Sequence, residues 1–397
     1  MKYRDVGLLS VGHLVTDINQ GALSAMLPFF IAAHDLSYAA AAGIVFAANI
    51  TSSIVQPLFG HAADRFSKPW MLSVGLMLAG LGLAFTGIFQ SYRWIMLLAV
   101  VSGIGIAAYH PVAARLVNFA AGNRKGTAMS YFGVGGTGGF AIGPLFVTMP
   151  LLHWGLKGTL VLTVPVTIMS IIMMTQFSRF ESLEGSTLQK TSIGLEDATE
   201  EWGAFLRLTI TVIGRSIIFY ALNTFIPIYW INGLHQSKAA GAMALTLFAG
   251  FGILGNLMGG SLADRIGQKK VVLIGSVGLT LFLPLLISTD NVSIATLLLI
   301  PIGLMQSATY SPTIVLGQTY LPNRIGFSSG VTLGVAFAIG GGAVPIIGGI
   351  ADSYGIWFAL ASIAYLPVLS SAIALTLPEA KRIVEKRGPK ETLIDSA

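Results

Sequence analysis

The chain contains no cysteine and little charge. Without Cys it can form neither a disulfide framework nor a thiolate metal site, and cysteine usage says nothing about its redox compartment. Charged residues make up only 10% of the 397 residues, against roughly 25% in soluble domains. A chain so poor in charge cannot cover a water-facing surface, so we expect lipid to surround most of it. The net charge of +6 does not indicate nucleic-acid binding, because the basic residues are scattered.

Long apolar runs make up most of the sequence. It is 54% hydrophobic, with a mean hydropathy of +0.77, and a membrane helix needs about 20 apolar residues. The first run is too long and too polar for a signal peptide, since it carries His13, Asp17, Asn19 and Gln20. Breaks in hydropathy predict twelve spans, near residues 7–32, 39–60, 70–89, 94–116, 127–149, 158–178, 204–231, 239–262, 271–288, 293–317, 326–350 and 356–377.

The basic residues predict the orientation of these spans. Of the 23 Lys and Arg residues, only Arg93, Lys157 and Lys238 fall on one side of the twelve-span arrangement, and Arg215 lies within a span. All the others fall on the side that holds both termini. Because cytoplasmic loops are enriched in Lys and Arg, we expect both termini to be cytoplasmic.

A charged motif occurs twice, about 200 residues apart. Residues 60–69 read G-H-A-A-D-R-F-S-K-P, and residues 260–270 read G-S-L-A-D-R-I-G-Q-K-K. A repeat on this scale indicates two homologous halves. The predicted fold is an all-α membrane protein of twelve transmembrane helices in two pseudo-symmetric six-helix halves. The predicted regions are an N-terminal half (1–178), a cytoplasmic linker (179–203), a C-terminal half (204–377) and a poorly ordered cytoplasmic tail (378–397).

The linker is the one long polar interruption between the halves. Its residues 195–202 are compatible with a short amphipathic helix on the membrane surface, and equally with a flexible tether. Both interpretations are open at this level.

The repeated motif also suggests a conformational latch. Asp64 lies at the cytoplasmic end of the second span, where its carboxylate can accept hydrogen bonds from a helix N-terminus or pair with Arg65 or Arg115. The alternative is a short loop that is merely anchored by positive charge. The predicted latch residues are Gly60, Asp64, Arg65, Lys68, Arg115, Asp264 and Arg265.

The pattern G-x-x-A-D-R-x-x-x-K between the second and third spans resembles the signature loop of the major facilitator superfamily. Residues 21–30, 37–43, 52–60 and 103–111 resemble the fosmidomycin-resistance group of bacterial drug exporters. The resemblance implies a transporter of the bacterial cytoplasmic (inner) membrane that exchanges protons for small, often anionic or amphiphilic compounds. It implies no enzyme activity, no cofactor and a functional monomer, with lipid, protons and the substrate as partners.

Two features bear on the direction of transport. Drug antiporters usually carry an arginine in the fourth span, where this chain reads L-L-A-V-V-S before Gly103. Their glycine-rich signature in the fifth span is kept as G-G-T-G-G-F-A-I-G-P, ending at Pro144, although close helix packing through small residues would also explain it. Export therefore follows from the resemblance, and uptake symport of a sugar or organic anion is the alternative.

Polar residues within the first span indicate the coupling site. Ser10, His13, Asp17, Gln20 and Ser24 recur every three or four residues and so share one helix face. Asp17 is the one carboxylate deep within a predicted span, and such residues are usually functional. We predict that it exchanges protons, with His13 and His110 as further candidates. The alternatives are a fixed ion pair at Asp17 and simple packing for His110.

The repeat places Arg215 of the seventh span at the depth of Thr16, which predicts an ion pair with Asp17. Protonating Asp17 would then free the guanidinium to hold an anion. The alternative is that Arg215 extends to the cytoplasmic interface. No nucleotide loop, nucleophile triad or metal-ligand cluster is recognisable, so no metal site is predicted. The predicted substrate-binding residues are Gln20, Asn49, Gln56, Tyr109, Arg215, Asn223, Gln306 and Tyr310.

Overall fold

The computed structural model describes residues 1–36, 38–65, 69–192 and 199–379. Lys68 and nearly all of the predicted tail lie outside these residues. Within them, every regular element is a helix. Helices are expected in lipid because they satisfy their backbone hydrogen bonds internally.

Six helices form the N-terminal half. They are α1 (Tyr3–His34), α2 (Tyr38–Arg65), α3 (Trp70–Phe85), α4 (Tyr92–Ala121), α5 (Lys125–Trp154) and α6 (Thr163–Thr175), with a 3-10 segment at Gly155–Leu162 between the last two. The C-terminal half contains α8 (Trp202–Ile228), α9 (Lys238–Ile266), α10 (Gln268–Ile287), α11 (Val292–Ala308), α12 (Tyr310–Tyr320), α13 (Ile325–Gly330), α14 (Ala336–Tyr354), α15 (Ile356–Ala364) and α16 (Leu366–Thr376), with π-helical turns at Tyr229–Gly233 and Val331–Val335.

These elements agree with twelve spans. Among the described residues, ten helical stretches are long and apolar enough to cross a membrane. One of them, Lys125–Thr175, runs through two predicted spans, and the shorter apolar helix α3 supplies another. The last three predicted spans are each divided, into α11 and α12, α13 and α14, and α15 and α16.

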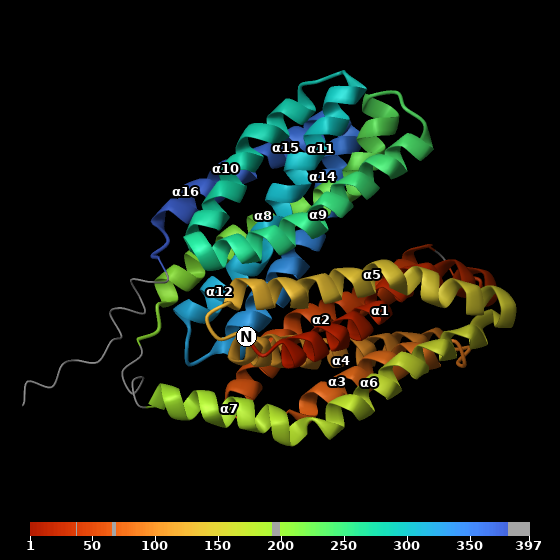
Figure 1. The fold of residues 1–397 in the computed structure, drawn as a ribbon. Helices are drawn as coiled ribbons and strands as arrows, with labels where there is room; N and C mark the ends of the chain where they lie inside the picture. Colours follow the sequence, from red (N-terminus) through yellow and green to blue (C-terminus); the bar gives the residue numbers. More distant parts are fainter. Residues whose placement is uncertain (37, 66–68, 193–198, 380–397) are drawn as a thin grey trace, which may run out of the picture.

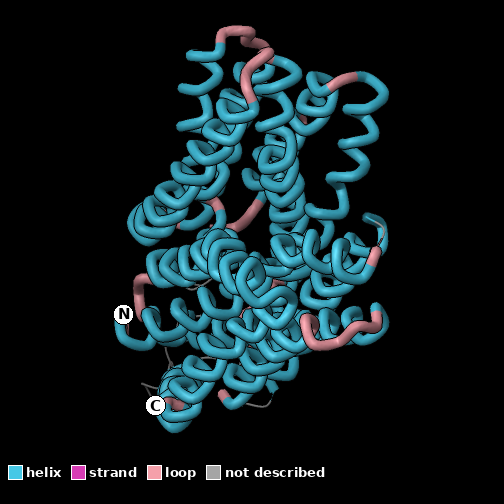
Figure 2. Tube along the Cα trace, turned by 90° about the vertical axis from the view of Figure 1, so that its right-hand side faces the viewer, coloured by secondary structure: helices cyan, strands magenta, loops and turns pink. Residues whose placement is uncertain are grey.

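The two halves meet at one end and diverge at the other. In Figure 1 the N-terminal half (red to yellow) lies below the C-terminal half (green to blue), and they approach each other on the side of the N-terminus. Figure 2 shows both halves as bundles of roughly aligned helices. The end where they meet is the predicted cytoplasmic end, and we call the contact between the halves there the cytoplasmic seam.

Glycines permit the close approach at this seam. Gly60 of α2 lies against the backbone of Gly326 in α13, and Gly126 of α5 lies against Gly260 of α9. A Cβ atom on any of the four would overlap backbone or side-chain atoms of the opposite half. Two of the helix pairs that join the halves at the seam, α2 with α13 and α5 with α9, thus approach each other through glycines.

The structure of the linker region differs from what the sequence predicted. A helix, α7 (Phe177–Ser192), covers its first part, and Phe180 and Leu183 are buried there at helical spacing. The possible helix at 195–202 is not present in residues 199–201, and residues 193–198 lie outside the described chain. The sequence did not predict α7 because most of its residues are polar. Its narrow apolar stripe packs against α4.

Candidate functional site

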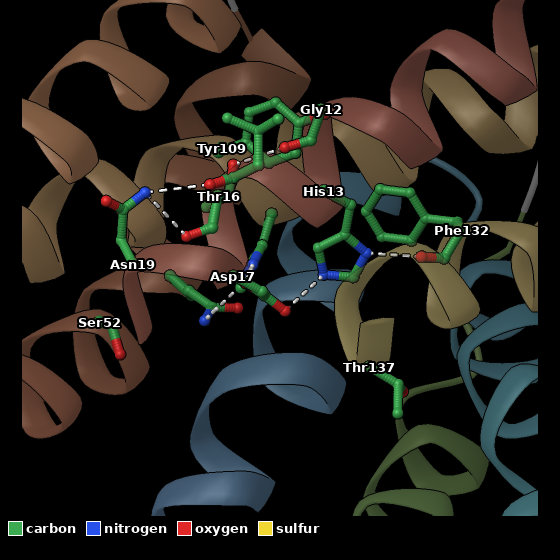
Figure 3. Close-up of polar contacts among 12 residues, drawn as sticks. Gly12, His13, Thr16, Asp17, Asn19, Ser52, Tyr109, Phe132 and Thr137 are labelled. Carbon is green, nitrogen blue, oxygen red and sulfur yellow. Dashed lines mark hydrogen bonds and ion pairs between the residues drawn. The ribbon is translucent and has the colours of Figure 1, made fainter. Parts of the chain in front are cut away.

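Three polar side chains converge between α1 and α4. Asp17 Oδ1 lies 2.9 Å from His110 Nε2, and Asp17 Oδ2 lies 3.3 Å from His13 Nε2. Asp17 is only 8% exposed, and both histidines are buried. Figure 3 shows the contact between the carboxylate of Asp17 and the imidazole of His13. The structure therefore brings together all three residues predicted to handle protons, and we call them the proton cluster.

The hydrogen-bond network assigns the protons on both rings. His13 Nδ1 lies 2.6 Å from the Phe132 carbonyl oxygen, which can only accept, so Nδ1 carries a proton. His110 Nδ1 faces the amide nitrogen of Gln56 at 3.4 Å and therefore accepts. The proton of a neutral His110 is then on Nε2, where it is donated to Asp17.

One proton is missing from this network. With a neutral His13 and an ionised Asp17, the Nε2 lone pair of His13 would face the Oδ2 lone pairs of Asp17. A single additional proton, on either atom, turns this repulsive contact into a charge-assisted hydrogen bond. The contact between His13 and Asp17 is therefore favourable when the pair holds one proton more than a neutral His13 and an ionised Asp17. The nitrogen and oxygen atoms of the three side chains of the proton cluster that could bind a metal ion lie within 4.8 Å of one another. However, the 2.9 Å between His110 Nε2 and Asp17 Oδ1 is the length of a direct hydrogen bond.

The glycine-rich motif of α5 makes room for this cluster. Gly139 and Gly143 lie against the backbone of α1, so that the two helices touch along their length. A Cβ atom at Gly136 would lie 2.5 Å from His13 Cε1 and 2.7 Å from Asp17 Oδ2. Close packing, the alternative interpretation of the motif, is thus also what keeps the proton cluster in place.

The predicted pair between Asp17 and Arg215 is absent from the structure. The guanidinium of Arg215 lies over the rings of Tyr310, at 5.2 Å, and Phe337, at 5.6 Å, and none of the described ion pairs includes it. It does not reach the interface either, because Arg215 is only 7% exposed. The repeat did not give the direction in which Arg215 points from α8.

Asp64 fastens α2 to the opposite half. Its carboxylate accepts hydrogen bonds from the backbone N–H groups of Gly326, at 2.8 Å, and Phe327, at 2.9 Å, in the first turn of α13. Arg115 Nε lies 3.2 Å from the same carboxylate and also pairs with the buried Glu184 of α7. A carboxylate at a helix N-terminus is stabilised by the free N–H groups and by the helix dipole.

Asp264 makes the corresponding contact in the other direction. It accepts hydrogen bonds from the backbone N–H groups of Gly126 (2.7 Å) and Thr127 (2.8 Å) at the start of α5, and from the Thr127 hydroxyl (2.7 Å). Leu316 stands in the repeat position of Arg115, so this copy has no guanidinium. Arg65 and Arg265 are exposed, and neither forms an ion pair with a residue that the structure describes.

The remaining predicted residues are dispersed. Tyr109 is fully buried and donates to the Leu9 carbonyl at 2.8 Å, within the N-terminal half. Since adjacent helical residues point about 100° apart, Tyr109 cannot share the direction of His110. Gln306 donates to the Arg215 backbone carbonyl at 2.8 Å, Asn223 donates to its own helix, Asn49 is exposed and Gln20 is half-buried. Tyr310 adjoins Arg215, and Gln56 adjoins the proton cluster.

The structure adds residues that the sequence analysis did not identify. Asn118 of α4 donates to Gln318 of α12 across the seam at 2.5 Å, and Gln318 donates to Ser329 at 2.9 Å. Both Asn118 and Gln318 are buried. Asn118 lies about one turn beyond Arg115, but amides at span ends are too common to single out. Of the two aromatic partners of Arg215, Tyr310 was predicted, whereas Phe337 carried no signal because aromatic residues are plentiful in the spans.

A two-half bundle with duplicated latches and a buried polar cluster defines a secondary transporter. The sequence model of the Major Facilitator Superfamily matches residues 9–345, and the chain belongs to that superfamily. It is therefore a multi-pass membrane transporter and not an enzyme, as predicted.

Two curated bacterial relatives align over almost the whole chain. One is the uncharacterised MFS-type transporter YfnC of Bacillus subtilis (strain 168), 31% identical over 392 residues, covering 95% of this chain and 93% of that protein. Another is the fosmidomycin resistance protein of Escherichia coli (strain K12), 27% identical over 381 residues, covering 94% and 92%.

Solved structures show the same fold. The proton:xylose symporter XylE is similar with a TM-score of 0.75 at 12% identity, over 95% of this chain and 96% of that one. The human organic anion transporter MFSD10 is similar with a TM-score of 0.74 at 13% identity, over 94% and 99%.

Proposed function

We propose that the chain is a proton-coupled antiporter that exports a small drug or metabolite across the bacterial cytoplasmic membrane, with His13, Asp17 and His110 as its coupling site. The observation that carries the proposal is the contact between His13 Nε2 and Asp17 Oδ2, which needs one more proton than the neutral rings supply. Such a proton site, buried at mid-span, is what a transporter needs to link proton movement to alternating access.

The polar stripe of α1 gives protons a path to this site. Asp17 is buried, Gln20 one turn further is half-buried and Ser24 is exposed. This gradient runs toward the end where the halves diverge in Figure 1. With the seam closed, protons enter from the outer side. Release to the cytoplasm then requires the seam to open, and substrate binds from the cytoplasm in that state.

Export is supported by a relative. The fosmidomycin resistance protein aligns with 94% of this chain, and a membrane transporter can give resistance to a compound by moving it out of the cell. The proton cluster itself serves either direction, so the sign of the exchange must be measured.

The experiment uses purified protein in liposomes that contain a pH-sensitive dye. Fosmidomycin is the first compound added outside, followed by a panel of small amphiphiles. In antiport, entry of the compound expels protons, so we expect the lumen to become more alkaline. Asp17→Asn should reduce this signal to that of empty liposomes, whereas the exposed carboxylate variant Asp352→Asn should behave like the wild type.

Two results would contradict the proposal. Acidification of the lumen as the compound enters would show symport and identify the chain as an uptake system. An unchanged pH signal in Asp17→Asn would remove the coupling role from the proton cluster.

A further inference from the structure

We propose that Arg215 and the aromatic rings around it form the binding site for the transported compound, and that this compound is an anion with an apolar body, such as a carboxylate or phosphonate on an aromatic or alkyl group. The inference names the substrate class of the proposed transporter and rests on that proposal. Arg215 lies at the middle of α8.

The guanidinium of Arg215 is buried without a counter-ion. Arg215 is only 7% exposed. Its side chain makes no hydrogen bond or ion pair with any residue that the structure describes. Its Nε atom is an unsatisfied buried donor. Arginine stays protonated at every physiological pH, and an uncompensated buried charge is strongly unfavourable. The missing partner is therefore an anion supplied from outside the described chain.

Three rings define what else that anion carries. Tyr310 and Phe337 lie against the guanidinium and contact each other at 6.2 Å between ring centroids, and Tyr220 contacts Phe337 at 6.0 Å. All three rings are half-buried. A planar guanidinium fork beside aromatic faces suits an anionic group with an apolar body: the fork binds two oxygens, and the rings cover the rest.

The same rings connect this site to the proton cluster. Tyr220 and Tyr310 lie within electrostatic range of both the Arg215 guanidinium and the Asp17 carboxylate. Tyr310 also packs on Gly133 of α5, where a Cβ atom would lie 2.7 Å from its ring. Gly133 directly follows Phe132, whose carbonyl holds His13. An anion at Arg215 and a proton between His13 and Asp17 are thus linked through Tyr310 and the adjacent residues Phe132 and Gly133 of α5.

The test measures equilibrium binding, without transport. Purified protein in lipid nanodiscs is titrated by calorimetry with phenylphosphonate, with methylphosphonate and with the cation benzylamine. We expect phenylphosphonate to bind at least about 10-fold more tightly than benzylamine. Arg215→Gln should weaken phenylphosphonate roughly 10- to 100-fold, as expected for a charged hydrogen-bond pair, and leave benzylamine unchanged.

Phe337→Leu is the second variant, because it keeps the charge and decides the question if Arg215→Gln does not fold. It should weaken phenylphosphonate more than methylphosphonate. Equal affinity of the wild type for phenylphosphonate and benzylamine, or no binding of phenylphosphonate, would overturn the inference, as would unchanged phenylphosphonate affinity in folded Arg215→Gln.

The Asp17→Asn variant separates this inference from the proposed function. It should retain phenylphosphonate binding while losing proton exchange. Binding that depends on Arg215 without any proton exchange in the wild type would overturn the proposed function alone. Proton exchange with compounds that bind independently of Arg215 would overturn this inference alone.

Discussion

Asp64 and Asp264 make the same contact in opposite directions across the cytoplasmic seam. Each carboxylate accepts two backbone N–H bonds from the first turn of a helix in the other half, Asp64 from α13 and Asp264 from α5. They differ in their side-chain partner, which is Arg115 for Asp64 and the Thr127 hydroxyl for Asp264. The two contacts together hold the halves in the arrangement of Figure 1.

Replacing Asp64 by Asn should destabilise the closed seam. Losing a charged acceptor costs about 1–3 kcal/mol, which is roughly a 5- to 150-fold change in a two-state equilibrium. Because the chain has no cysteine, a Ser24→Cys variant gives one labelling site on the outer stretch of α1. We expect slower maleimide labelling of this site when Asp64→Asn is added. Unchanged labelling and turnover, matching those of Asp352→Asn, would show that Asp64 is only a loop anchor.

The amide pair of Asn118 and Gln318 should behave as a third fastening of the seam. Asn118→Leu leaves the Gln318 carbonyl oxygen without its donor in a buried place, which costs about 1–3 kcal/mol. The double variant Asn118→Leu/Gln318→Leu should cost less than the sum of the two single changes, because no orphaned amide remains at position 118 or 318. Thermal unfolding of the four proteins completes the cycle. Strict additivity would mean that the two amides do not interact.

Gly136→Ala should disrupt the proton cluster without touching a titratable residue. The added methyl group would press on both His13 and Asp17, so we expect proton exchange to fall by at least an order of magnitude. Gly138→Ala is the matched control in the same motif, since its Cβ atom would meet only Leu14 Cδ1 at an ordinary 3.7 Å. Equal activity of the two variants would contradict the geometry of the cluster.

Tyr109→Phe should affect stability and not transport. Its hydroxyl donates to the Leu9 carbonyl within the N-terminal half, and an average buried hydrogen bond contributes about 1 kcal/mol. We expect a lower unfolding temperature with unchanged affinity for the transported compound. A loss of affinity comparable with that of Arg215→Gln would instead show that Tyr109 contributes to substrate binding.

The fold was predictable because hydropathy and the repeat are strong signals along the chain. The twelve spans and the two halves follow from apolar length and from the recurrence of Gly60 and Asp64 as Gly260 and Asp264, and the superfamily confirms them. The helix α7 was missed because its surface is polar and only a narrow stripe at Phe180 and Leu183 is apolar. Hydropathy averages over a window, so it does not register such a stripe.

The site was predictable only within one helix. The regular spacing of His13 and Asp17 on α1 placed both on one face. His110 was predicted as a further candidate, but spacing could not show that it reaches Asp17 from α4. The predicted ion pair between Asp17 and Arg215 was wrong because it required knowing how two different helices, α1 and α8, face each other. A repeat relates their depths, but the rotation of each helix about its axis depends on packing partners such as Tyr310 and Phe337, which leave no periodic trace in the sequence.

The crossed arrangement of the two latch carboxylates also limits how the transporter can move. Since each half supplies one acceptor and one helix N-terminus, either contact still joins the halves when the other breaks. Full opening of the seam therefore requires both sets of hydrogen bonds to break. A weakened contact at either carboxylate should then accelerate the opening of the whole seam.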